Sequence, residues 1–174
     1  MISFKLWLEN EEIPAPGVLP IPPNHVRLYH YTKVNDTNDS TATAAANNLR
    51  KNGIDINQSK GSTYGEPNVV WASTVMPNRN KVFAEFSIDV NDPRWMMGKP
   101  NGLNPREYEK MGWDCYFNDS IAPQEIIAVH EPWHERYRYL LSNPELLIKA
   151  KNGDFDHLLN QPGYGYAIAM AKNK

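Results

Sequence analysis

The stretch HVRLYHYT, residues 25–32, determines how the rest of the chain is interpreted. It is rich in aromatic and β-branched residues, which predicts a β-strand. The preceding stretch, IPAPGVLPIPPN (13–24), is rich in proline, which fixes the backbone and removes hydrogen-bond donors. We therefore expect residues 1–24 to form an extended, proline-rich lead-in. A chain of 174 residues is long enough for one domain and short for two, so we expect residues 25–174 to form a single domain.

The segments that follow predict one helix and then several strands. An alanine run begins just after Ser40, a favourable N-cap residue, and Gly53 follows Arg50 and Lys51, so residues 40–53 predict a helix. Further strands are expected at PNVVWAST (67–74), KVFAEFSIDV (81–90), WDCYFND (113–119) and EIIAVHE (125–131), with a long loop at 91–105. Helical segments are expected near HERYRYLLS (134–142) and PELLIKAKNG (144–153).

This order of elements predicts an α+β fold. A strand and a helix are followed by a run of strands and then by helices, so the sheet is expected to be mostly antiparallel or mixed. No G-x-G-x-x-G or P-loop sequence is present, which argues against a Rossmann or nucleoside-triphosphate-binding fold.

Composition limits the class of partner and the cellular compartment. With 18 basic and 20 acidic residues the formal net charge is −2, so no overall attraction to phosphate backbones is expected. Cys115 is the single cysteine, which excludes an internal disulfide and a zinc site built from several thiolates. The first ten residues do not resemble a signal peptide, and no apolar run is long enough to cross a bilayer. We expect a soluble, cytoplasmic protein that does not bind a membrane.

The stretch HEPWH, His130 to His134, matches the H-E-x-x-H pattern of zinc hydrolases. In those enzymes both histidines project from one face of a helix. Here EIIAV predicts a strand before His130, and Pro132 denies His130 a place in a helix interior. We therefore expect a strand ending at His130 and a helix from about Trp133, with no metal assigned. A zinc hydrolase is kept as an alternative, with the third ligand drawn from Glu145, Asp154 or His157.

Four stretches, taken in order, resemble the ADP-ribosyltransferases of the diphtheria-toxin and poly-ADP-ribose-polymerase branch. They are RLYHYTK (27–33), LRKNGI (49–54), VVWAST (69–74) and WDCYFNDSIAPQEIIAV (113–129). The resemblance covers roughly residues 25–130. It implies a split, mostly antiparallel ADP-ribosyltransferase-like sheet with flanking helices. It also implies an NAD-dependent mono-ADP-ribosyltransferase, similar to bacterial or phage enzymes and toxins. The acceptor would be an unidentified protein, nucleic acid or small molecule, and a self-poisoning enzyme would need an antitoxin.

The resemblance also implies a role for individual residues. His30 would hold a ribose hydroxyl of NAD, Tyr31 would clamp the nicotinamide carboxamide through its backbone, and Thr32 would brace His30. Asp114 occupies the position of the family's catalytic glutamate, which favours single transfer over polymer extension.

The acid and the aromatic position both leave alternatives open. Glu125 or Asp92 could replace Asp114 as the acid. Trp71 stands where the family has tyrosine, and because indole only donates a hydrogen bond it cannot replace the tyrosine hydroxyl. Tyr64, in the glycine-bounded loop GSTYGEP (61–67), could supply the missing ring.

These residue types suit the cleavage of NAD. Breaking the bond between ribose and nicotinamide passes through an oxocarbenium-like transition state, as in glycoside cleavage. The leaving group is already cationic, so a general acid is not needed, whereas a nearby carboxylate stabilises the developing charge. The departures at Trp71 and Asp114 equally suit a non-catalytic module of the same fold that binds NAD or nucleic acid. An interaction protein whose aromatic residues form only its core is a further alternative.

Overall fold

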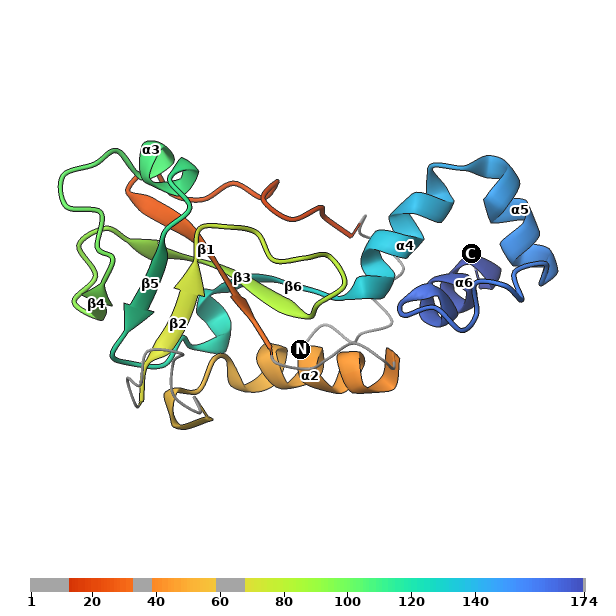
Figure 1. The fold of residues 1–174 in the computed structure, drawn as a ribbon, viewed down its shortest axis with the longest axis horizontal. Helices are drawn as coiled ribbons and strands as arrows, with labels where there is room; N and C mark the ends of the chain where they lie inside the picture. Colours follow the sequence, from red (N-terminus) through yellow and green to blue (C-terminus); the bar gives the residue numbers. More distant parts are fainter. Residues whose placement is uncertain (1–12, 33–38, 59–67, 174) are drawn as a thin grey trace.

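The computed structural model describes residues 13–32, 39–58 and 68–173 and contains a six-stranded sheet (Figure 1). Its strands are β1 (His25–Tyr31), β2 (Val70–Ser73), β3 (Phe83–Asp89), β4 (Trp95–Met97), β5 (Asp114–Phe117) and β6 (Ile126–His130). Every neighbouring pair is antiparallel, and the spatial order is β4-β5-β2-β1-β3-β6. The prediction of an α+β fold with a mostly antiparallel sheet is confirmed.

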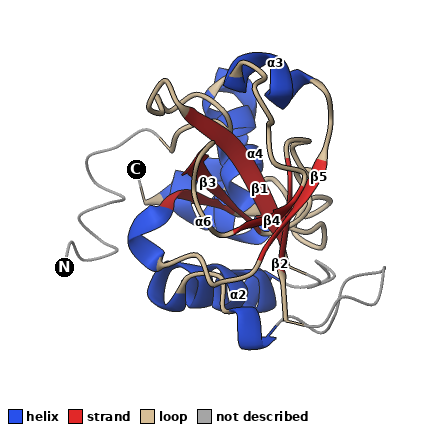
Figure 2. Cartoon of the chain, turned by 90° about the vertical axis from the view of Figure 1, so that its left-hand side faces the viewer, coloured by secondary structure: helices blue, strands red, loops and turns tan. Residues whose placement is uncertain are grey.

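Helices lie below the sheet, above it and at one end of the molecule (Figure 1 and Figure 2). They are α2 (Asp39–Asn52), α3 (Pro105–Lys110), α4 (Pro132–Leu141), α5 (Pro144–Asn152) and α6 (Tyr164–Lys172), with single 3₁₀ turns η1 (Ile56–Gln58) and η2 (Pro123–Glu125). In Figure 1, α2 runs beneath the sheet, and α4, α5 and α6 gather at the right-hand end. Within the described ranges, no helix has the length and apolar character that a bilayer crossing requires.

Most expected elements are found, with two corrections. The segment 91–105, predicted as a loop, contains β4, because Trp95 is buried and its strand pairs with β5. The helix α2 begins at Asp39, so Ser40 lies in its first turn and is not the N-cap. The helix ends before Gly53 as predicted, and Gly53 has the positive φ of 72° that favours glycine.

The two faces of the sheet have different surroundings. Residues directly opposite each other in an antiparallel pair point to the same face, and the face alternates along each strand. One face, here called the Leu28 face, carries Leu28, Ala72, Phe86 and Phe117 and forms the main core. From α2, Ala42, Ala46 and Leu49 pack into this core. The opposite face, here called the Tyr31 face, carries Tyr29, Tyr31, Trp71, Ser73, Glu85 and Asp114.

Residues 13–24 cross the Tyr31 face without forming a helix or strand, and they are held by hydrogen bonds from three directions. The amide of Gly17 donates to the Glu85 carboxylate at 3.1 Å, and the Arg27 guanidinium donates to the carbonyl of Leu19. Arg138 of α4 donates to the carbonyls of Ile13 and Pro14, both at 3.3 Å. This part of the lead-in therefore packs against both the sheet and the helical end. Residues 1–12 lie outside the described ranges.

The helical end has a core of its own. Trp133, Tyr137, Leu140, Phe155 and Ile168 are among the buried residues that α4, α5, α6 and the intervening segment contribute to it. Ile13 of the lead-in packs into the same core. The chain thus buries two hydrophobic clusters, and β6 leads directly into the helical one through α4.

Candidate functional site

His30 lies near the end of β1, with its side chain directed toward the Leu28 face, because it pairs with Ala84 of β3. Its Nδ1 donates a hydrogen bond to the main-chain carbonyl of Trp71, with 2.7 Å between nitrogen and oxygen. Burial lowers the pKa of His30 below its usual value of 6.5. The imidazole is therefore neutral at neutral pH, with its proton on Nδ1 and a lone pair on Nε2 that can accept a hydrogen bond.

The pairing of β1 with β2 explains why a side chain can reach the Trp71 carbonyl. Between β1 and β2 the register is given by Tyr29 opposite Ser73, whereas β1 and β3 pair continuously from His25 to Tyr31. The contact from His30 to Trp71 adds a second link between β1 and β2. The site therefore lies where the sheet is least continuous.

Tyr31 and Trp71 form an aromatic pair on the Tyr31 face. Their ring centroids are 4.7 Å apart with an interplanar angle of 77°, an edge-to-face contact, and both residues are half-buried. The amide of Thr32 donates to the carbonyl of Val82 at 3.0 Å, and its hydroxyl does so at 3.3 Å. Thr32 thus ties the end of β1 to the segment before β3. The imidazole of His30 is held by the Trp71 carbonyl and not by Thr32.

Asp114 begins β5 and is exposed. It pairs with Ser73, which also pairs with Tyr29, so its side chain shares the Tyr31 face with Trp71 and Tyr31. Two strand spacings separate the backbones of Asp114 and Tyr29, a distance of about 10 Å. The structure therefore brings Asp114 and the aromatic pair together on one face, while the imidazole of the neighbouring His30 starts from the other. A ligand that contacts both Asp114 and the imidazole of His30 must extend around the end of the short pairing between β1 and β2.

The two alternative acids have a structural role. Arg94 donates to the carboxylates of both Asp92, at 2.9 Å, and Glu125, at 3.0 Å. Glu125 also accepts from the amide of Ala122 at 2.8 Å. These contacts with Arg94 lower the pKa of both carboxyl groups. Asp114, in contrast, makes no ion pair with any residue in the described ranges, so its carboxylate is available to a ligand.

Tyr64 lies outside the described residues. Its expected contribution of a ring to the site stays a prediction.

The HEPWH stretch forms a joint between β6 and α4. As predicted, the strand ends at His130, and the helix begins at Pro132. His130 donates from Nε2 to the buried Glu85 at 2.9 Å. Glu131 accepts from Arg50 at 2.7 Å and from Thr43 at 3.1 Å. The two histidines therefore do not share one helical face.

The rest of the motif agrees with this structural role. The Nδ1 of His134 accepts a hydrogen bond from the Glu131 amide at 3.4 Å, which caps the start of α4. In the described part of the chain, no group of three or more His, Cys, Asp or Glu side chains is arranged to hold a metal ion.

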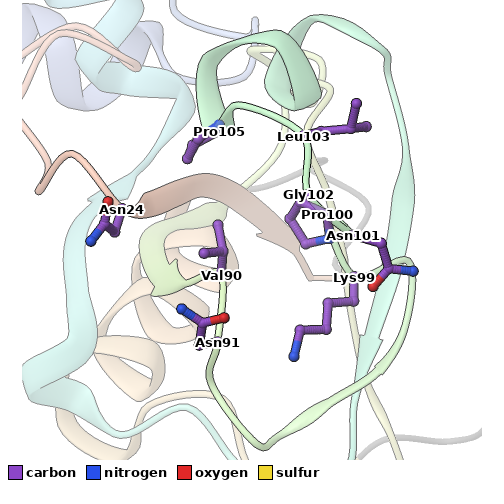
Figure 3. A pocket seen from close by; sticks show the side chains of 9 residues that line it. All are labelled: Asn24, Val90, Asn91, Lys99, Pro100, Asn101, Gly102, Leu103 and Pro105. Carbon is purple, nitrogen blue, oxygen red and sulfur yellow. The ribbon is translucent and has the colours of Figure 1, made fainter.

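A hollow of about 580 Å³ with a mixed polar and apolar lining lies elsewhere, where β1 begins and β3 ends (Figure 3). It is lined by Asn24, Val90, Asn91, Lys99, Pro100, Asn101, Gly102, Leu103 and Pro105. None of the residues predicted for the site lines it. Its amide and ammonium side chains are exposed, so it is a solvated depression at the opposite end of β1 from Tyr31.

One residue beside the candidate site was not singled out from the sequence. The ammonium Nζ of Lys81 lies 4.4 Å from the ring centroid of Tyr31. In the sequence Lys81 appears only as the first residue of a predicted strand, and nothing local indicates that it reaches β1.

The chain matches no protein-family model, no curated protein and no solved structure. The function is therefore inferred from the geometry and chemistry of the residues themselves.

Proposed function

We propose that the protein is an NAD-dependent mono-ADP-ribosyltransferase that binds NAD beside β5, β2 and β1. The observation that carries this proposal is the placement of Asp114, Trp71 and Tyr31 on one face of the sheet, beside the backbone of His30, whose imidazole has a defined tautomer and is directed toward the opposite face. These residues come from three separate stretches that carry the family resemblance, 27–33, 69–74 and 113–129.

Each group has a chemical role in the proposed reaction. The lone pair on Nε2 of His30 accepts a hydrogen bond from a ribose hydroxyl, which orients the sugar. The rings of Tyr31 and Trp71 provide apolar surface for the nicotinamide. The carboxylate of Asp114 stabilises the positive charge that develops on the ribose as the bond to nicotinamide breaks. Nicotinamide leaves as a neutral molecule, and a nucleophile of the acceptor then bonds to the ribose carbon.

The proposal also interprets the fold as an ADP-ribosyltransferase-like split sheet. The pairing between β1 and β2 is short, whereas β1 and β3 pair along the whole of β1, and this difference supports the interpretation as a split sheet. Asp92 and Glu125 both form ion pairs with Arg94, so their carboxylates are already engaged within the protein. This supports Asp114 as the catalytic acid. We further propose a cytoplasmic enzyme that uses NAD as a substrate. Its acceptor would be a protein, a nucleic acid or a small molecule.

Nicotinamide release from NAD by the purified protein tests the proposal. The variants His30→Ala and Asp114→Asn should each reduce release by at least about 100-fold, because each loses a group that acts in the transition state. Asp119→Asn is the matched control, since Asp119 is also an exposed aspartate that follows β5 and lies outside the proposed site. Release that persists in both variants contradicts the assignment.

The same assay separates the enzyme from the non-catalytic alternative. A module that only binds NAD would show saturable binding of NAD without release of nicotinamide. Mass shifts of candidate acceptors after incubation with NAD would identify the acceptor. If expression is toxic to the host and His30→Ala relieves the toxicity, the enzyme is a self-poisoning modifier that requires an antitoxin.

A further inference from the structure

An exposed apolar surface adjoins Asp114 where β5 begins. It consists of Val75, Met76, Met111 and Trp113, which are 56%, 37%, 54% and 49% exposed, and is here called the Trp113 surface. The amide of Thr74 donates to the carbonyl of Trp113 at 3.0 Å. A Cβ at Gly112 would lie 3.4 Å from the side chain of Val75, so the two segments are side by side. Large apolar side chains gathered in this way are typical of a surface that binds another molecule.

The Trp113 surface lies on the side of Asp114 that is away from the aromatic pair. Trp71 comes before Ser73 along β2, and Ser73 is opposite Asp114 on β5. The hydrogen bond from Thr74 to Trp113 comes next in the same direction. Asp114 therefore stands between the level of Trp71 and the Trp113 surface.

This position suits the approach of an acceptor to the ribose of NAD. With nicotinamide on Trp71 and the ribose beside Asp114, the bond from C1′ of the ribose to nicotinamide points toward Trp71. A nucleophile approaches C1′ from the side opposite the bond that breaks, as water does in inverting glycoside cleavage. That side faces the Trp113 surface. The rest of the dinucleotide extends from C4′ of the ribose, out of this line, so it does not have to occupy the surface.

The charges around the Trp113 surface favour a protein over a nucleic acid. Residues 73–76 and 111–114 contain no lysine or arginine. Lys110 and Glu107 of α3, taken with Asp114, leave a net negative charge beside the surface. A nucleic acid requires cations along its phosphates, whereas a protein segment with apolar side chains can cover the surface without them.

We infer that the acceptor is a protein, bound through apolar side chains that flank its nucleophilic residue and pack on the Trp113 surface. This inference rests on the proposed function, which supplies the positions of nicotinamide and ribose. The acceptor nucleophile forms the new bond to C1′ and gives its proton to solvent, and the electron pair of the broken bond leaves with neutral nicotinamide. Trp113 and Met111 then determine how much ADP-ribose reaches the acceptor instead of water.

The test supplies NAD together with short peptides, each with one nucleophilic side chain flanked either by leucine and phenylalanine or by glycine and serine. A single-stranded oligonucleotide of mixed sequence is the nucleic-acid probe. The measured quantity is the ratio of ADP-ribose transferred, from the mass shift of the probe, to nicotinamide released. For the wild-type protein this ratio should be at least about tenfold higher with leucine and phenylalanine than with glycine and serine. Trp113→Ser and Met111→Ser should each lower it by about tenfold, and Trp113→Phe should keep most of it.

Ile148→Ser is the matched control, because Ile148 is 59% exposed on α5, at the helical end. If the wild-type protein releases nicotinamide and the ratio is the same in Trp113→Ser and Ile148→Ser, the role of the surface is overturned and the proposed function stands. Transfer to the oligonucleotide alone, or to no probe while nicotinamide is still released, overturns the protein acceptor. Absence of nicotinamide release by the wild-type protein overturns the proposed function and this inference with it.

Discussion

Glu85 and His130 lie on neighbouring strands, and the imidazole Nε2 donates to the carboxylate at 2.9 Å in the interior of the protein. The same carboxylate accepts from the guanidinium of Arg27 on β1 and from the amide of Gly17 in the lead-in. Glu85 is 1% exposed, so bulk water does not compete with these donors for the carboxylate. One side chain thus connects β1, β3, β6 and the lead-in.

Replacing Glu85 by glutamine should therefore be strongly destabilising. The variant leaves the Arg27 guanidinium buried without a counter-charge, and loss of one partner of a buried ion pair costs about 3–5 kcal/mol. Chemical denaturation should show this decrease in the free energy of unfolding. Glu135→Gln is the control, because Glu135 also accepts from arginines but is more exposed, and its loss should cost about 1 kcal/mol or less. Equal losses in the two variants would contradict the central role of Glu85.

The free energy of unfolding should also depend on pH through His130. Burial lowers the pKa of His130 from 6.5 to about 4 in the folded protein. Between these values the unfolded chain binds more protons than the folded one, so stability rises with pH across this window. The full difference is about 3 kcal/mol, which is lost as the pH falls from about 7 to about 4.

His130→Gln is the variant that tests this dependence. Glutamine can keep a hydrogen bond to Glu85 but does not titrate, so the variant should show a shallower loss of stability on acidification. The partly buried His30 and the buried His134 also have lowered pKa values, and their contribution of the same sign should remain. The exposed His157 provides the control, and His157→Gln should keep the wild-type slope. Parallel curves for the wild-type protein and His130→Gln would exclude this histidine as a source of the dependence.

Gly53 should tolerate no side chain. A Cβ at this position would lie 2.1 Å from the carbonyl oxygen of Ile121, and the φ of 72° is unfavourable for other residues. Gly53→Ala should lower the free energy of unfolding by more than about 3 kcal/mol. The main chain at Ile121 would have to move, and the alanine would also have to adopt a strained backbone conformation. Gly102 has a φ of 73° but open space around its Cβ position, so Gly102→Ala should cost only about 1 kcal/mol. Thermal melts of the two variants separate crowding from backbone strain, and similar shifts would rule out crowding at Gly53.

Substitution of Trp71 should distinguish the role of its ring from the role of its main-chain carbonyl. The contact with His30 uses the Trp71 carbonyl, which every variant keeps, whereas the contact with Tyr31 uses the ring. Trp71→Phe should keep nicotinamide release within about threefold, and Trp71→Ala should raise the KM for NAD by about fivefold to tenfold. If the two variants lose activity equally, the ring is not a platform for nicotinamide.

The rate of nicotinamide release should depend on His30 on the acid side of neutrality. Protonation of Nε2 removes the lone pair that is proposed to accept from the ribose. The pKa of His30 is lowered, so kcat/KM should stay constant down to pH 6.5 and should fall only below that value. A midpoint above pH 6.5 would show that another group controls the profile. His30→Gln should abolish this limb if the remaining rate is measurable.

The sequence predicts elements best where local periodicity and the buried pattern agree. The strands β1, β2, β3, β5 and β6 are recognisable because β-branched and aromatic residues concentrate in them. The strand β4 has only three residues and ends just before Gly98, and its stability comes from pairing with β5 and from the burial of Trp95. Such a strand depends on distant residues, so a local pattern does not reveal it.

The site shows the same division. The strand that carries His30 could be predicted from its own residues, because aromatic and β-branched side chains concentrate in it. The face of the sheet on which Asp114 lies could not be predicted from the sequence, because it depends on the register of β5 with β2 and of β2 with β1. The contacts of Asp92 and Glu125 with Arg94 also arise only when η2 packs beside the segment after β3.

The strand order has a consequence for biosynthesis. The first strands to leave the ribosome, β1, β2 and β3, occupy the centre of the sheet, and their outer neighbours β5 and β6 come from residues 114–130. Until those residues emerge, β2 and β3 present bare edges whose amides and carbonyls can pair with other nascent chains. Translational stalling between residues 90 and 113 should therefore yield an aggregation-prone product that engages chaperones, whereas release after residue 130 allows the sheet to close.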